Sequence, residues 1–71
     1  MNQNAIKKVV NVLEHINPPW GVNGTKFSAH FKGIIGRGQT PNQAIVHLIS
    51  LVTQIKELKE DFDYAISKAG Q

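Results

Sequence analysis

The sequence contains no cysteine and only three histidines. Without cysteine the chain forms no disulfide, and a structural zinc site would need His15, His30 and His47 together with a carboxylate. These histidines show neither zinc-finger spacing nor the two-histidine helix motif of zinc proteases, so we expect no metal and no other cofactor. A domain this small buries only about 60% of its unfolded-chain surface. Self-association is therefore the remaining route to added stability.

Long apolar runs are absent as well. The N-terminal stretch is polar up to Lys7 and Lys8, and the apolar pair Val9-Val10 is followed at once by Asn11. No segment approaches the roughly 18 consecutive apolar residues of a membrane span. The apolar centre of a secretion signal is missing too. We therefore expect a soluble, cytoplasmic protein that has no membrane partner.

Acidic residues are scarce in the first part of the chain. The formal net charge is +3, and up to Ser50 the only carboxylate is Glu14, whereas the remainder mixes lysines with acids. A basic front predicts an anionic partner, and a mixed-charge tail is typical of a solvated helix. The basic residues of the front are Lys7, Lys8, Lys26, Lys32 and Arg37.

The first periodic stretch predicts a helix over residues 4–17. Apolar side chains recur there at three- and four-residue spacing, as on one face of an amphipathic helix. The following Asn17-Pro18-Pro19 would end it, because proline cannot continue the helical hydrogen bonds. The apolar positions of this stretch are Ile6, Val9, Val10, Leu13 and Ile16.

Residues 20–39 predict a β-hairpin or three-stranded sheet. Asn23-Gly24 is a strong signal for a tight hairpin turn. From Lys26 to Lys32 polar and apolar residues alternate strictly, which predicts a strand with one face in the core and a basic face in water. A turn at Gly33 and a short third strand complete this region.

The last stretch predicts one long helix over residues 40–69, opened by Thr40-Pro41. Its apolar residues alternate four- and three-residue steps, which is a heptad pattern. A helix of about 29 residues would be on the order of 43 Å long, whereas the domain diameter is roughly 28 Å. Either a second subunit covers the protruding part, which we favour, or the helix breaks near Glu60-Asp61. The expected dimer interface comprises Leu48, Leu51, Ile55, Leu58, Phe62 and Ala65.

These elements predict a single α+β domain over residues 1–71, with an N-terminal helix, a small antiparallel sheet and a long C-terminal helix. Lys26 to Val52 loosely resembles the double-stranded-RNA-binding domain in its strand, short strand, small-residue turn and helix. The resemblance rests on Phe27-Ser-Ala-His-Phe31, Gly36-Arg-Gly38 and Ala44. That family opens its second helix with a phosphate-gripping, lysine-rich motif, which is Thr40-Pro41-Asn42-Gln43 here. The resemblance is architectural and assigns no family.

Two neighbouring features point to a phosphate-bearing ligand. The first is a basic stripe on one strand face. One interpretation is that it binds along a nucleic-acid backbone, and the other is that its lysines protect the sheet edge from pairing with another strand. The second is a glycine-rich turn before a helix N-terminus, which binds an anion or, alternatively, only supplies positive φ. Trp20 either stacks on a base or caps the core. The candidate ligand-binding residues are Trp20, Lys26, His30, Lys32, Gly36, Arg37, Gly38 and Thr40.

No set of residues converges as a nucleophile, base and orienting group would in an enzyme. We therefore expect a non-enzymatic, homo-oligomeric binding protein for nucleic acid or a nucleotide, with a dimer favoured. The alternative is a protein-interaction module or inhibitor that binds a protein target through its sheet edge or long helix. Such a small, basic, cysteine-free chain would suit a phage accessory protein.

Overall fold

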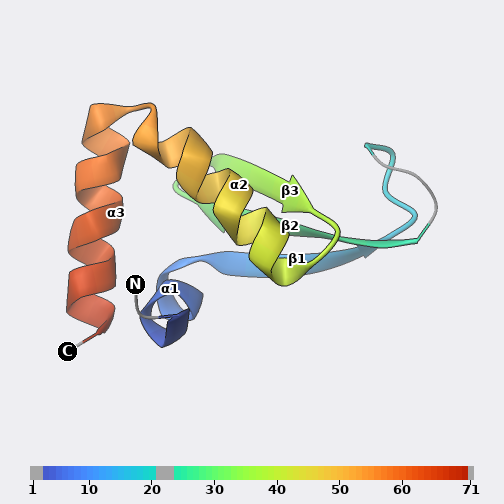
Figure 1. Cartoon of the computed structure of the whole chain (residues 1–71), viewed down its shortest axis with the longest axis horizontal. Coiled ribbons are helices and arrows are strands. Elements are labelled where there is room, and N and C mark those ends of the chain that lie inside the picture. The colour runs from blue at the N-terminus through green and yellow to red at the C-terminus, as the bar shows by residue number, and fades with distance from the viewer. Residues whose placement is uncertain (1–2, 21–23, 71) are drawn as a thin grey trace.

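The computed structural model describes residues 3–20 and 24–70, and it confirms the α+β class. A short N-terminal helix precedes a three-stranded antiparallel sheet of order β1-β2-β3, and two helices follow (Figure 1). The elements are α1 (Gln3–Val9), β1 (Asn11–Ile16), β2 (Thr25–Phe31), β3 (Ile34–Gly38), α2 (Pro41–Thr53) and α3 (Lys56–Ala69).

The predicted helix over residues 4–17 is wrong beyond Val9. The chain bends at Val10 and continues as β1, which pairs antiparallel with β2 from Asn11↔His30 to Ile16↔Thr25. Three- and four-residue spacing favours a helix locally, but β1 gains a full ladder of backbone hydrogen bonds from β2. This pairing between distant segments outweighs the local preference.

The two hairpins differ in their turns. The β1–β2 loop begins at Asn17, whose φ is 51°, and is closed by the Asn17 N–H donating to the Gly24 carbonyl at 2.9 Å. The tight turn predicted at Asn23-Gly24 includes Asn23, which lies outside the described residues. The turn predicted at Gly33 is confirmed, and two residues join β2 to β3 there. Lys32 and Gly33 have φ values of 46° and 82°, as in a type I′ turn.

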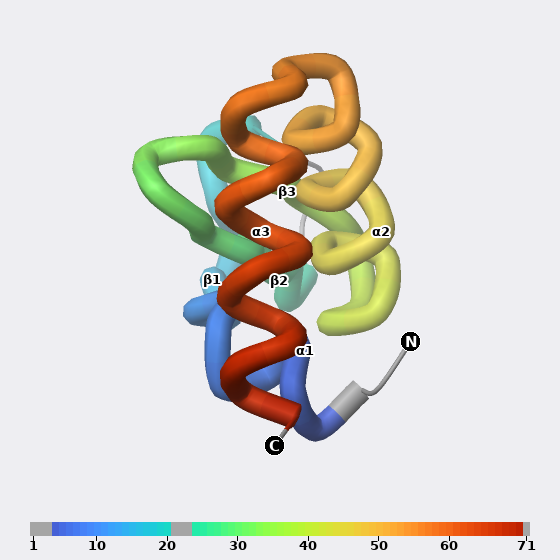
Figure 2. The backbone as a smooth tube through the Cα atoms, turned by 90° about the vertical axis from the view of Figure 1, so that its left-hand side faces the viewer, coloured from blue at the N-terminus to red at the C-terminus, as the bar shows by residue number. Residues whose placement is uncertain are grey.

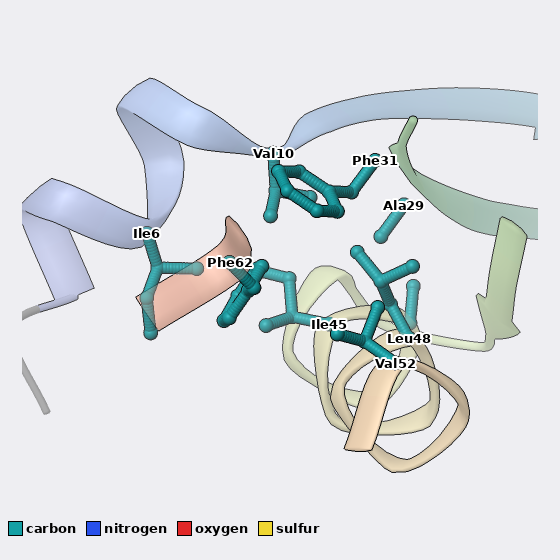
Figure 3. Packing of buried hydrophobic residues seen from close by; sticks show 9 residues of the cluster. Ile6, Val10, Ala29, Phe31, Ile45, Leu48, Val52 and Phe62 are labelled. Carbon is teal, nitrogen blue, oxygen red and sulfur yellow. The ribbon is translucent and has the colours of Figure 1, made fainter. Parts of the chain in front are cut away.

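Helix α2 covers one face of the sheet. The predicted alternation in β2 is confirmed on this side: Ala29 and Phe31 are buried, and Phe27 packs against the same core. Leu48 and Val52 of α2 are fully buried opposite them (Figure 3). The core cluster consists of Ile6, Val10, Ala29, Phe31, Ala44, Ile45, Leu48, Val52 and Phe62.

The predicted continuous helix over residues 40–69 is also wrong. Helix α2 ends at Thr53, and Ile55 takes an extended conformation with φ −119° before α3 begins. The break precedes Glu60-Asp61, and α3 turns back to pack against α1 and α2 (Figure 2). No glycine or proline marks this break. It is favoured because the turn brings Phe62, only 3% exposed, into the core of its own chain.

The heptad positions consequently do not form one exposed stripe. Leu48 and Phe62 are buried in the core, and Leu58 and Ala65 pack against it. Leu51 is half-buried and Ile55 is 47% exposed. The dimer interface was expected because one continuous helix would be longer than its domain. Since the segment forms two shorter helices, this reason for the interface no longer applies.

Candidate ligand-binding face

The sheet has a second face, opposite α2, which we call the outer face. Because side chains alternate along strands, the register of the three strands determines which residues share it. His15 lies opposite Lys26, and Ser28 lies between Leu13 and Arg37. The outer-face residues are Asn11, Leu13, His15, Lys26, Ser28, His30, Ile35 and Arg37, and none of these eight is a carboxylate.

Two histidines of the outer face share one hydroxyl. Nε2 of His15 and Nε2 of His30 each lie 2.7 Å from Oγ of Ser28. A hydroxyl donates one hydrogen bond, so it donates to one imidazole and accepts from the other. With both rings neutral, His15 and His30 therefore hold opposite tautomers. Ser28 is only 2% exposed, so this bridge fixes both rings against the central strand.

Trp20 folds over the outer face from the β1–β2 loop. Its ring meets the His15 imidazole edge-on, with centroids 5.8 Å apart. On the same face, from the strand at the other edge of the sheet, Cζ of Arg37 lies 5.3 Å from the centroid of the Trp20 ring. Because His15 is on β1 and Arg37 on β3, the indole reaches across the central strand. The Trp20 side chain is half-buried, and its ring forms an aromatic surface beside the Arg37 cation.

Lys26 is the unusual residue of this face. Its side chain is only 7% exposed, although lysine is almost never this buried without a partner. In the part of the chain that the structure describes, no hydrogen-bond acceptor or carboxylate contacts its ammonium group. Every fully buried side-chain nitrogen in this part of the chain has a hydrogen-bond partner. Because the Lys26 Nζ has no partner, it is not fully buried: it retains contact with solvent, while its methylene stem is covered. The result is an uncompensated positive charge held at the surface.

Lys32, predicted to extend the basic stripe, lies elsewhere. It occupies the β2–β3 turn, and its Nζ forms an ion pair with Asp61 of α3 at 3.1 Å. Its charge is therefore compensated and is separate from Lys26 and Arg37.

The glycine-rich turn serves packing. Neither Gly36 nor Gly38 has positive φ; both lie in β3, where α2 approaches closely. A Cβ on Gly38 would lie 2.6 Å from the Ala44 nitrogen, and one on Gly36 would overlap the Leu48 backbone. These glycines are needed for space. The alternative prediction, that the glycines of this region only supply positive φ, holds for Gly33 and is wrong for Gly36 and Gly38.

The N-terminus of α2 already has its own caps. Thr40 Oγ1 accepts a hydrogen bond from the Gln43 N–H at 3.1 Å, and Gln43 Oε1 accepts one from the Gln39 N–H at 2.9 Å. The Thr40 hydroxyl is thus used within the chain, as its N-cap role requires. This leaves the outer face as the better candidate for an anion.

Four predicted site residues thus share the outer face and the loop above it: Trp20, Lys26, His30 and Arg37. His15 and Ser28 were missed. His15 falls within the predicted helix over residues 4–17, and that prediction does not place it opposite Lys26 in a sheet. Ser28 could have been found, because its alternation in β2 places it on the same face as His30.

Comparisons with protein-family models, with curated proteins and with solved structures find no match to this chain. Within residues 3–20 and 24–70, no helix is both long and apolar enough to cross a bilayer. The same residues contain no group of three or more metal-ligating side chains.

Proposed function

We propose that this chain is a non-enzymatic binding protein whose outer face binds the phosphates of a single-stranded nucleic acid. The observation that carries this proposal is Lys26. A lysine that is 7% exposed and has no carboxylate beside it lies on a face without acidic residues. An anionic ligand supplies the missing countercharge.

The neighbours of Lys26 suit a phosphate. Arg37 carries a planar guanidinium that can donate two parallel hydrogen bonds to phosphate oxygens. His15 lies directly opposite Lys26 in the strand register. Phosphate contacts from lysine and arginine release counterions, which gives affinity without sequence preference.

Trp20 favours a single strand as the ligand. Proteins that bind single strands combine a basic track with aromatic rings on which bases stack. Here the indole lies at the same face as the cations and is already oriented by His15 and Arg37. A base beside a bound phosphate would meet this ring.

Binding is better supported than catalysis. The most nucleophile-like group, the Ser28 hydroxyl, is 2% exposed and has both of its hydrogen-bonding roles occupied by imidazoles. No outer-face carboxylate orients either ring, as the base of a hydrolytic triad requires.

The test is the salt dependence of binding to a labelled single-stranded oligonucleotide, measured by fluorescence anisotropy. We expect a Kd within about 10⁻⁴–10⁻⁶ M near physiological salt, as for non-specific contacts. Lys26→Gln and Arg37→Gln should each reduce the magnitude of the log Kd against log salt slope by about 0.7, the value for one phosphate contact on a single strand. Lys56→Gln, which removes the same charge from α3, should leave the slope unchanged.

No binding by the wild type at about 50 mM salt would contradict the proposal, as would a slope unchanged in both outer-face variants. The interaction would then be sought with a protein target, for which contacts depend less on salt.

A further inference from the structure

The two edges of the sheet are protected to different degrees. At the β3 edge, the Arg37 backbone N–H donates to Nδ1 of His47 on α2 at 2.9 Å. The helix thereby satisfies a backbone group that a further strand would need. At the opposite edge, β1 pairs with β2 alone in the part of the chain that the structure describes.

The β1 edge also lacks most of the features that usually discourage strand addition. Asn11–Ile16 contains no lysine, arginine, proline or glycine. Two of its apolar side chains are exposed instead, with Leu13 at 42% and Ile16 at 75%. Exposed edges with unpaired backbone groups are templates for another strand, and the one charged residue of this edge is Glu14. In Figure 1, α1 lies beyond the N-terminal end of β1.

We infer that β1 pairs antiparallel with β1 of a second copy of this chain, with the two Leu13 residues opposite each other at the twofold axis. The outer faces of both copies lie on the same side only if paired residue numbers are both odd or both even. Two such registers pair five residues of β1. A register centred on Glu14 would place two carboxylates opposite each other, which is destabilising.

The register centred on Leu13 is self-complementary. It places the exposed Leu13 side chains in contact, and it places Asn11 of each copy opposite His15 of the other. Glu14 then lies opposite Val12 of the other copy, so the two Glu14 carboxylates do not face each other. This match between β1 and itself identifies a second copy as the occupant.

The pairing creates one six-stranded sheet, in the order β3-β2-β1-β1-β2-β3. Both outer faces become a continuous surface that carries two sets of Lys26, Trp20 and Arg37. If the function proposed above holds, a single nucleic-acid strand can cross both sets. The pairing of the two β1 strands does not depend on that function.

The first test is the mass of the protein by sedimentation equilibrium from about 1 to 500 µM. We expect a concentration-dependent dimer that is lost in Leu13→Lys. Ile35→Lys is the matched control, because Ile35 is 38% exposed on the same outer face but at the opposite edge, and this variant should remain dimeric. A wild type that is monomeric throughout, or an Ile35→Lys variant that dissociates equally, would overturn the inference.

The second test does not depend on the lysine variants folding. Because the chain has no cysteine, Leu13→Cys introduces a single thiol whose only disulfide partner is its copy. Directly opposed strand residues bring Cβ atoms to about 4.5–5.5 Å, close enough for a disulfide after a small adjustment. Oxidation should cross-link Leu13→Cys quickly and Ile35→Cys slowly. Equal rates for the two variants would exclude the Leu13 register.

Discussion

The ring of Phe62 in α3 meets the ring of Phe31 in β2 edge-on, with centroids 5.1 Å apart and planes at 90°. This contact joins the last helix to the central strand. It explains why the C-terminal region folds back although no glycine or proline interrupts it.

Phe62→Ala should therefore lower the free energy of unfolding by about 3–5 kcal/mol, the range for truncating a buried aromatic residue. Urea denaturation measures this loss. Tyr64→Ala is the control on the same helix, since Tyr64 is 65% exposed and should cost less than about 0.5 kcal/mol. Equal losses in the two variants would mean that α3 is not held by Phe62.

Gly38→Ala should destabilise the protein by about 1–3 kcal/mol, because the added methyl group overlaps the start of α2. Gly33 offers a contrast, since its surroundings are open but its φ is 82°. Gly33→Asn should be tolerated better than Gly33→Ala, because asparagine adopts positive φ more readily. Thermal unfolding of the three variants separates the two requirements. A neutral Gly38→Ala would refute the close approach of α2.

Ser28→Ala should cost about 1–3 kcal/mol, because it leaves both partially buried imidazoles without their shared partner. Ser50→Ala, at an exposed position on α2, should be close to neutral. In NMR spectra, the ring signals of His15 and His30 should both shift in Ser28→Ala, while His47 stays in place. Shifts confined to one histidine would contradict the bridge.

Asp63 raises the pKa of Lys59 above its usual 10.5, first through their 2.8 Å hydrogen bond and then through their opposite charges. A raised pKa in the folded state means that this contribution to stability is present below the unfolded-state pKa and is lost as the pH rises through the folded-state pKa. NMR titration of the Lys59 side chain should give a midpoint above 10.5 in the wild type, and a lower midpoint in Asp63→Asn. An identical midpoint in both proteins would show that Asp63 does not form the ion pair with Lys59.

The sequence was sufficient where a local pattern decided the structure. Strict alternation located β2 and assigned its residues to two faces, and Thr40-Pro41 located the start of α2. The prediction that the basic face lies in water is wrong at Lys26 and Ser28, which are buried. It failed where a distant partner decided. The spacing of Val10, Leu13 and Ile16 suits a helix, and only the ladder offered by β2 makes this segment a strand.

The candidate site follows the same division. Lys26, His30 and Arg37 were predicted from alternation and charge, and Trp20 from its aromatic ring. The bridge through Ser28 could not be predicted, because it depends on a histidine from a strand that the local pattern had hidden. The ion pair that removes Lys32 from the site depends on the return of α3, which local periodicity does not encode.

The most direct test of the proposed outer-face site uses Trp20, the only tryptophan in the chain, as its own reporter. Its fluorescence is measured while a single-stranded oligonucleotide is added at low salt. We predict a saturable change in the wild type and in Lys56→Gln, and no change over the same range in the Lys26→Gln, Arg37→Gln double variant. A double variant that saturates as the wild type does, or a wild type whose Trp20 emission never responds, would contradict the proposal that the outer face binds nucleic acid.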